Sequence, residues 1–150
     1  MTQWIAYTDG GCAPSNPGPA GWGAVLVNAA SKEAVELSGY IGPGTNQIAE
    51  LTAAIEALSH IPAGDSVELV LDSQYVLKGI SEWRTGWERR GWKNAKGEPV
   101  ANLSLWRKLF ALTDMRKVSV RWVKGHSGHP ENERADQLAS AAIAAGRQAA

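Results

Sequence analysis

The hydrophobic period of this sequence changes near residue 46, and that change constrains the fold class. Before it, residues 3–8, 23–27 and 33–41 are alternating or β-prone, and turn signals rich in glycine and proline separate them. After it, apolar residues recur at helical spacing over residues 46–60, which predicts an amphipathic helix. The sequence therefore predicts three strands, most simply an antiparallel meander, followed by a helix.

The remaining segments predict further strands and helices in alternation. Residues 67–71 are a short, mostly apolar run typical of a strand covered on both faces, and residues 118–123 alternate as a fifth strand. Further helices are expected at residues 73–80, 102–112 and 135–143. This order predicts an α/β fold with a five-stranded mixed sheet and helices on both faces. We expect a single domain over residues 1–150, with a frayed tail at about 146–150.

Composition narrows the possible classes of protein. The single cysteine, Cys12, cannot form an internal disulfide, and no apolar run approaches the roughly 20 residues of a membrane span. We therefore expect a cytoplasmic protein with no membrane association. We also expect a monomer with no obligate protein partner, because no segment resembles an exposed coiled-coil seam. The formal net charge of zero argues weakly against nucleic-acid binding.

The distribution of charge is more informative than the sum. Residues 82–96 contain five basic residues, two acidic residues and three of the seven tryptophans. The basic residues are Arg84, Arg89, Arg90, Lys93 and Lys96, and the tryptophans are Trp83, Trp87 and Trp92. Such interleaving is typical of a surface that grips a phosphate backbone, although we expect at least two of these tryptophans to pack in the core.

Four acidic residues fall near the predicted ends of strands and helices. Asp9 and Asp72 follow strands, whereas Glu50 and Asp136 lie early in helices. In a sheet of this kind, sites form beyond strand ends, where helix N-termini also point. Four carboxylates gathered there would repel one another, and Mg2+, which prefers oxygen ligands, would relieve that repulsion. The sequence therefore predicts a magnesium centre suited to phosphate chemistry.

Each acid alone also has a purely structural explanation. Asp9 before two glycines can be a turn residue, and Asp72 can cap a helix that begins at Ser73. The helix dipole favours Glu50 and Asp136 near helix starts. Their joint placement is what favours a site.

At these residues the sequence resembles bacterial ribonuclease HI. The resemblance runs in the family's order and spacing from the first predicted strand to the last helix. The motifs that carry it are Thr-Asp-Gly at 8–10, Asn-Gln-Ile-Ala-Glu-Leu at 46–51, Leu-Asp-Ser-Gln-Tyr-Val at 71–76, Gly-Trp-Lys at 91–93 and residues 122–136. The histidine-containing loop before Asp136 is the most specific of them.

The resemblance implies a fold, an activity and a cofactor. The fold is that of ribonuclease H, a five-stranded mixed sheet whose first three strands are antiparallel. The activity is endonucleolytic hydrolysis of the RNA strand of RNA/DNA hybrids, giving 5′-phosphate and 3′-hydroxyl products. The family's metal cluster maps onto Asp9, Glu50, Asp72 and Asp136, which would hold two Mg2+ ions, with Mn2+ able to substitute.

The resemblance also implies roles for single residues. Asp9 would bridge the ions, Asp136 would help hold the ion that activates water, and Glu50 and Asp72 would hold the ion at the leaving 3′ oxygen. His126 would assist with water or with product release, although it can also be an exposed loop histidine. Glu133 would lie near the metals, but it is equally well explained as a first-turn helix acid.

Hybrid recognition requires groups that sense the RNA 2′-hydroxyl and hold the DNA strand. Amide side chains can both donate to and accept from a hydroxyl, and a basic aromatic protrusion at about 82–98 would grip the DNA strand. Thr45 with Asn16 resembles the family's pocket for a DNA phosphate. The candidate substrate-binding residues are Gly10, Cys12, Asn16, Thr45, Asn46, Gln47, Gln74, Trp83, Trp87, Arg89, Arg90, Trp92 and Lys93. The acid Glu88 departs from the family's pattern and predicts a weaker grip.

Three rival functions remain open at this point. A ribonuclease H fold can bind hybrids without cutting them, but here all four acids are present. A relative of integrases or resolvases would lack the hybrid-reading amides and the protrusion. A small-molecule phosphatase would leave the protrusion unexplained.

Overall fold

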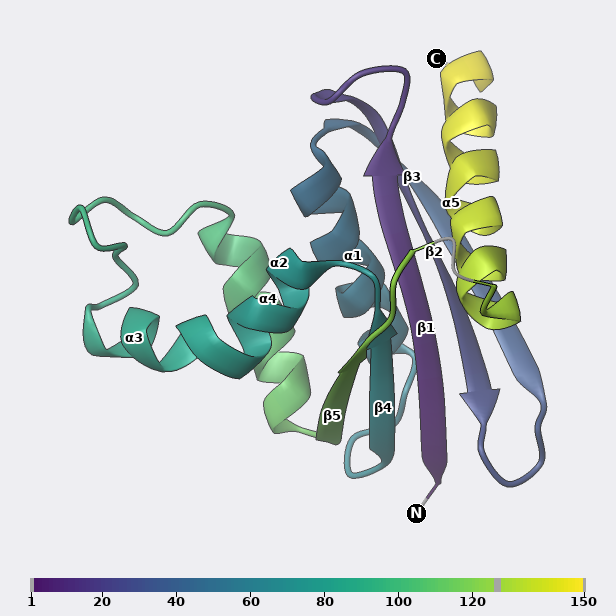
Figure 1. Cartoon of the computed structure of the whole chain (residues 1–150), viewed down its shortest axis with the longest axis horizontal. Helices are drawn as coiled ribbons and strands as arrows, with labels where there is room; N and C mark the ends of the chain where they lie inside the picture. The colour runs from purple at the N-terminus through teal and green to yellow at the C-terminus, as the bar shows by residue number, and fades with distance from the viewer. Residues whose placement is uncertain (1, 126–127, 150) are drawn as a thin grey trace.

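The computed structural model describes residues 2–125 and 128–149, which form one sheet with helices around it (Figure 1). The strands are β1 (Gln3–Cys12), β2 (Gly18–Asn28), β3 (Ala34–Gly44), β4 (Ser66–Leu71) and β5 (Lys117–Trp122). Their order across the sheet is β3-β2-β1-β4-β5. The pairs β1–β2 and β2–β3 are antiparallel, whereas β1–β4 and β4–β5 are parallel. The predicted mixed sheet with three antiparallel leading strands is confirmed.

The helices cover both faces of the sheet. They are α1 (Asn46–Ser59), α2 (Gln74–Lys78), α3 (Arg84–Arg89), α4 (Leu103–Asp114) and α5 (Pro130–Ala149), with a π-helical segment η1 (Gly79–Trp83) between α2 and α3. Helix α5 packs along β1, β2 and β3, while α1 packs on the other face with α4 beside it (Figure 1). None of the helices in the described parts of the chain is long and apolar enough to cross a membrane.

The main core lies between the sheet and helices α1 and α4. Leu51 and Leu58 of α1, Leu69 of β4 and Leu109 of α4 are fully buried there. Trp106 is also fully buried, and its Nε1 donates a hydrogen bond to Tyr75 Oη over 2.9 Å. A polar indole nitrogen is thus satisfied inside an otherwise apolar core.

Several element boundaries differ from the prediction, and the second strand, expected at 23–27, runs from Gly18 to Asn28. The Asp9-Gly10-Gly11 segment is not a turn, because β1 continues to Cys12 in register with β2 and Cys12 pairs with Ala20. The helix expected to end at residue 80 passes directly into η1 and α3. Helix α5 begins at Pro130, where the fixed φ of proline suits a first helical position.

Candidate active site

A cleft opens where β1 extends past the end of β4. The last pair between these strands is Thr8 with Leu71, yet β1 stays paired with β2 as far as Cys12. One edge of β1 is therefore left without a strand neighbour, between α1 and α5. The cleft has a volume of about 340 Å³ and is lined by Asp9, Gly10, Gly11, Cys12, Ala13, Asn46, Glu50, Asp72, Asp136, Ala139, Ser140 and Ile143. All four predicted acids line this one cleft.

The carboxyl group of Asp9 interacts directly with two other acids. Burial raises its pKa most, the charge of Asp72 and a hydrogen bond with Asp136 raise it further, and the result is about 9. The Gly10 backbone N–H donates to Asp9 Oδ1 over 2.9 Å and opposes this rise. In the absence of a cation, burial and the two neighbouring carboxylates therefore favour the protonated form of Asp9.

The carboxyl group of Glu50 enters the same cleft from α1. Burial raises its pKa most, and nearby Asp72 raises it further, whereas the Ser73 hydroxyl lowers it by donating to Glu50 Oε2 over 2.7 Å. Ser73 also accepts from the Val76 backbone N–H and is the N-cap of α2. Since Ser73 is the cap, the explanation of Asp72 as a helix cap is wrong.

The position of Asp72 is fixed by the end of β5 and the residues after it, as well as by β4. Trp122 at the end of β5 donates from Nε1 to the Asp72 backbone carbonyl over 3.1 Å. Gly125 lies so close that a Cβ there would be 3.1 Å from Asp72 Oδ2. The chain thus passes directly over this carboxylate.

Two glycines allow the helices that carry the acids to approach the sheet. A Cβ at Gly10 would lie 2.3 Å from the Ala49 carbonyl oxygen, next to Glu50 on α1. A Cβ at Gly23 would lie 2.3 Å from the Ala135 carbonyl oxygen, next to Asp136 on α5. A side chain at either position would force a helix backbone away, so these glycines set the depth at which Glu50 and Asp136 reach the cleft.

The helix dipole does not account for Glu50 or Asp136. Helix α1 has no acidic residue in its first turn, and the first-turn acids of α5 are Glu131 and Glu133. The two cleft acids lie in the second turns, where the dipole acts weakly. Glu133 does fit the structural explanation of a first-turn helix acid.

Amide groups form a second cluster beside the acids. Asn46 Oδ1 accepts from the Cys12 backbone N–H over 3.0 Å, and Asn16 Oδ1 accepts from the Asn46 backbone N–H over 3.1 Å. The Cys12 Sγ contacts both oxygens, at 3.3 and 3.4 Å. Thr45 is the N-cap of α1 and accepts from the Ile48 backbone N–H. Because both asparagine oxygens already accept, donation to a ligand would come from the asparagine nitrogens.

Two other predicted amides are separate from this cluster. Gln47 and Gln74 are the second residue of α1 and the first residue of α2, and both are exposed. His126 lies outside the described residues.

The basic aromatic protrusion, residues 82–98, divides into packed rings and exposed charges. Trp87 and Trp92 pack against the main core, whereas Trp83 is 36% exposed. At least two of the three tryptophans were expected to pack in the core, and Trp87 and Trp92 do pack against it, partly buried. Arg89, Arg90 and Lys93 are exposed.

The ligand atoms around Asp9 suit a hard divalent cation. They are carboxylate oxygens, and the raised pKa of Asp9 indicates that negative charge there is unfavourable without a counter-charge. Within residues 2–125 and 128–149, no three acidic, histidine or cysteine side chains already surround one point as ligands.

Comparison with known proteins settles the family. The family model "RNase H" matches residues 1–144 of this chain. The chain belongs to the ribonuclease H family. Ribonucleases H are endonucleases that depend on divalent metal ions, which agrees with an acidic cleft.

Relatives and solved structures of the family match over most of their length. The chain is 50% identical to "Ribonuclease H" of Geotalea uraniireducens over 137 residues, which cover 91% of each chain. The crystal structure of LC9-RNase H1, described as a type 1 RNase H with the type 2 active-site motif, superposes with a TM-score of 0.85 at 29% identity, covering 97% of this chain and 74% of that one. LC11-RNase H1, solved in complex with an RNA/DNA hybrid, gives a TM-score of 0.71 at 28% identity, covering 95% and 98%.

Sequence reasoning missed several residues of this ribonuclease H cleft. Ser73 holds Glu50, and Trp122 holds the Asp72 backbone. The wall formed by α5 consists of Ala139, Ser140 and Ile143. The capping preference of serine could have identified Ser73, whereas the contact of Trp122 joins residues 50 positions apart and has no local signal.

Proposed function

We propose that this chain hydrolyses the RNA strand of RNA/DNA hybrids at the cleft beside β1. The observation that carries the proposal is the convergence of Asp9, Glu50, Asp72 and Asp136 on one cleft. The family membership supports the activity, and the hybrid-bound LC11-RNase H1 supports the choice of substrate.

The four carboxylates are proposed to hold two Mg2+ ions, with Mn2+ as a substitute. Asp9 interacts with both Asp72 and Asp136, which suits a ligand that bridges two ions. Divalent cations held there would lower the pKa of an attacking water and offset negative charge on the leaving 3′ oxygen. Ser73 keeps the Glu50 carboxylate oriented, and Trp122 holds the backbone of Asp72. His126 is proposed to assist with water or product release, and Glu133 to lie near the metals.

The hybrid is proposed to lie across the cleft and the protrusion. Gly10, Cys12, Asn16, Asn46, Gln47 and Gln74 would face the RNA strand and its 2′-hydroxyl groups, and Thr45 with Asn16 would hold a DNA phosphate. Arg89, Arg90 and Lys93 would neutralise DNA phosphates, with the rings of Trp83, Trp87 and Trp92 beside them. Trp87 and Trp92 already pack against the core, so only part of each ring is open to a ligand.

The proposal is tested with a labelled hybrid and matched variants. We expect cleavage of the hybrid's RNA in Mg2+, none in EDTA, and none of single-stranded RNA, duplex RNA or duplex DNA. Asp72→Asn and Glu50→Gln should abolish cleavage. Glu56→Gln is the control, because Glu56 lies on the same helix as Glu50 but outside the cleft.

Other outcomes would favour other functions. Binding of the hybrid without cleavage under every metal tried would favour a binding module. Equal cleavage of duplex DNA would show that the chain is not specific for RNA/DNA hybrids. The monomeric state is checked by light scattering, where a mass near 16.0 kDa is expected.

A further inference from the structure

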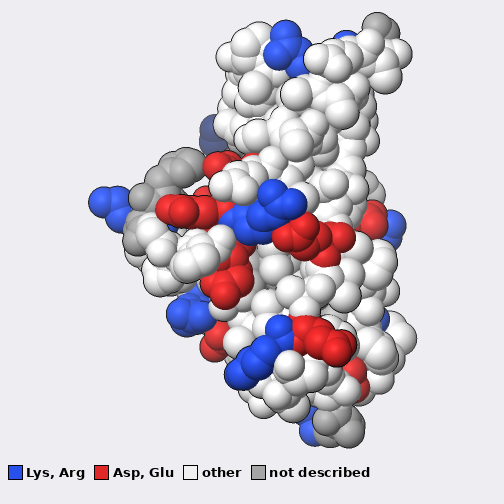
Figure 2. Space-filling view, turned by 90° about the vertical axis from the view of Figure 1, so that its right-hand side faces the viewer, with Lys and Arg blue, Asp and Glu red and all other residues white. Residues whose placement is uncertain are grey.

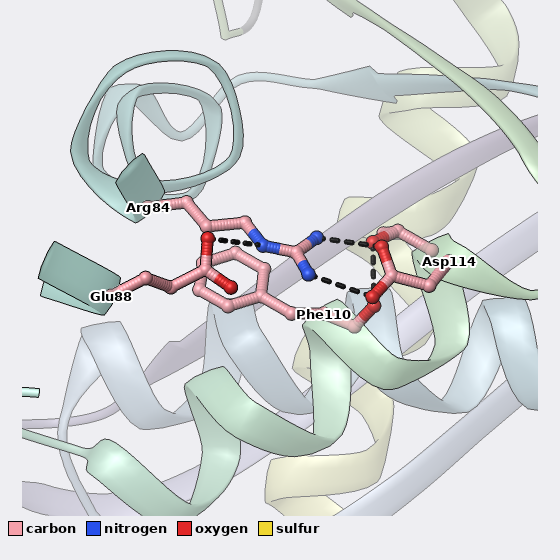
Figure 3. A network of polar contacts seen from close by, with 5 residues as sticks. Arg84, Glu88, Phe110 and Asp114 are labelled. Carbon is pink, nitrogen blue, oxygen red and sulfur yellow. Dashed lines mark hydrogen bonds and ion pairs between the residues drawn. The ribbon is translucent and has the colours of Figure 1, made fainter. Parts of the chain in front are cut away.

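One arginine of the basic aromatic protrusion is surrounded by carboxylates. Arg84 at the start of α3 donates from Nη1 and Nη2 to the two oxygens of Asp114, over 2.8 and 2.7 Å (Figure 3). Its Nε lies 3.4 Å from Glu88 Oε1, and its Cζ lies 4.7 Å from the centre of the Phe110 ring. Each guanidinium nitrogen therefore already has a carboxylate partner.

The other basic residues of the protrusion differ from Arg84 in this respect. Arg89, Arg90, Lys93 and Lys96 are exposed, and none of them forms an ion pair with the residues that the structure describes. The Arg84 side chain is only 26% exposed. The Asp114 hydrogen bond is the main reason why the pKa of Arg84 is raised, and the same bond lowers the pKa of Asp114.

Helix α3 has few other attachments to the body of the protein. None of its six residues is buried. Trp87 contacts the rings of Trp106 and Phe110, and Arg84 reaches Asp114 at the C-terminal end of α4, 30 positions along the chain. A bidentate pair restricts orientation as well as distance, so Arg84 fixes how α3 is turned on α4.

We propose that Arg84 and Asp114 are positioning residues for hybrid binding, and that Arg84 is not itself a phosphate contact. This inference rests on the proposed function. The pair holds α3 so that the exposed charges at its C-terminal end, Arg89 and Arg90, face the hybrid. Glu88 is the i+4 partner of Arg84 in the same network. Its carboxylate therefore lies against Arg84 and not against the DNA strand.

The sign of one substitution distinguishes positioning from simple charge. Asp114→Asn removes a negative charge near the phosphate-binding surface, so charge alone would lower KM for the hybrid. Positioning requires the opposite result. We expect KM to rise about two- to fivefold, the range of an exposed ion pair, with kcat unchanged.

Two matched variants separate the effects. Asp114→Glu keeps the carboxylate and should restore most of the affinity. Glu82→Gln removes one exposed acid that forms no ion pair in the described part of the chain, and charge alone should slightly lower its KM.

A shortened hybrid locates the effect within the molecule. We would shorten the hybrid until the parent protein and the Lys93→Met variant have the same KM. Equal values show that the hybrid no longer reaches the protrusion. On this substrate, Asp114→Asn should have the parent's KM, and its Tm should stay within a few degrees of the parent's.

The overturning results are equally specific. A KM that falls or stays constant on the long hybrid would show that Asp114 acts through charge alone or not at all. A KM that rises equally on both hybrids would place the effect outside the protrusion. If the parent neither binds nor cuts the long hybrid, the proposed function fails, and the inference fails with it.

Discussion

At the scale of single residues, the state of Asp9 depends on whether a cation is present. Its pKa is raised from 3.8 to about 9, chiefly by burial and by the charge of Asp72. Between these two values, the folded protein keeps a proton that the unfolded chain has released. The free energy of unfolding of the metal-free protein should therefore fall as pH rises, with a slope that approaches about 1.4 kcal/mol per pH unit.

This dependence is measured by urea unfolding in EDTA between pH 5.5 and 8.5. Asp9→Asn should flatten the curve and be more stable than the parent at pH 8. Mg2+ should also flatten the parent's curve, because the cation replaces the proton as the counter-charge. Parallel curves for parent and variant would contradict the assignment of the slope to Asp9.

The Ser73 hydroxyl connects helix capping to the acidic cleft. Ser73→Ala removes the cap of α2 and the donor to Glu50 together. We expect a loss of about 1–2 kcal/mol in stability and a lower kcat, whereas Ser73→Thr keeps both hydrogen bonds and should resemble the parent. Denaturant unfolding and initial rates on one hybrid measure both effects, and a Ser73→Ala variant with the parent's stability would refute the capping role.

At the scale of elements, the distance between helix and sheet decides whether the acids meet. Gly23→Ala would place a Cβ 2.3 Å from the Ala135 carbonyl oxygen and push α5 outward with Asp136. We expect a stability loss of about 1–3 kcal/mol, and a loss of activity on the order of 100-fold if Asp136 moves by about 1 Å. Gly11→Ala is the stability control, since its Cβ would be 3.6 Å from the nearest atom. A fully active Gly23→Ala variant would show that α5 can shift without affecting the cleft.

The sequence predicts the elements well and their contacts less well. The order of strands and helices and the sharing of one cleft by four acids follow from periodicity and from the family resemblance. The extension of β1 to Cys12 does not, because Asp-Gly-Gly is typical of a turn and only pairing with β2 overrides that preference. The contacts of Arg84 with Asp114 and of Asn16 with Asn46 each join residues 30 positions apart and have no local signal.

At the scale of the whole molecule, charge is distributed unevenly although its sum is zero. On the face that carries α5, Lys, Arg, Asp and Glu gather in the middle and lower parts, and the region above them is largely free of charge (Figure 2). Arg134 on α5 pairs with Glu36 of β3, over 2.7 and 2.9 Å. Among the residues that the structure describes, Arg134 is thus neutralised by a neighbour, whereas Arg89, Arg90 and Lys93 of the protrusion form no ion pair.

Hybrid binding should therefore depend strongly on salt despite the zero net charge. We expect KM to rise steeply between about 50 and 200 mM KCl, and Lys93→Met to reduce the slope of log KM against log salt by about 0.9, the value for one phosphate contact. A slope that Lys93→Met leaves unchanged would exclude this side chain as a phosphate contact.

The placement of Asp9 and Asp136 has a consequence during synthesis of the chain on the ribosome. One comes from the first strand and the other from the last helix, and they interact only after α5 has docked on the sheet. A nascent chain that has emerged as far as β5 contains all five strands, yet it still lacks one of the four acids of the cleft. The cleft therefore stays incomplete until the last helix has left the ribosome and docked on the sheet.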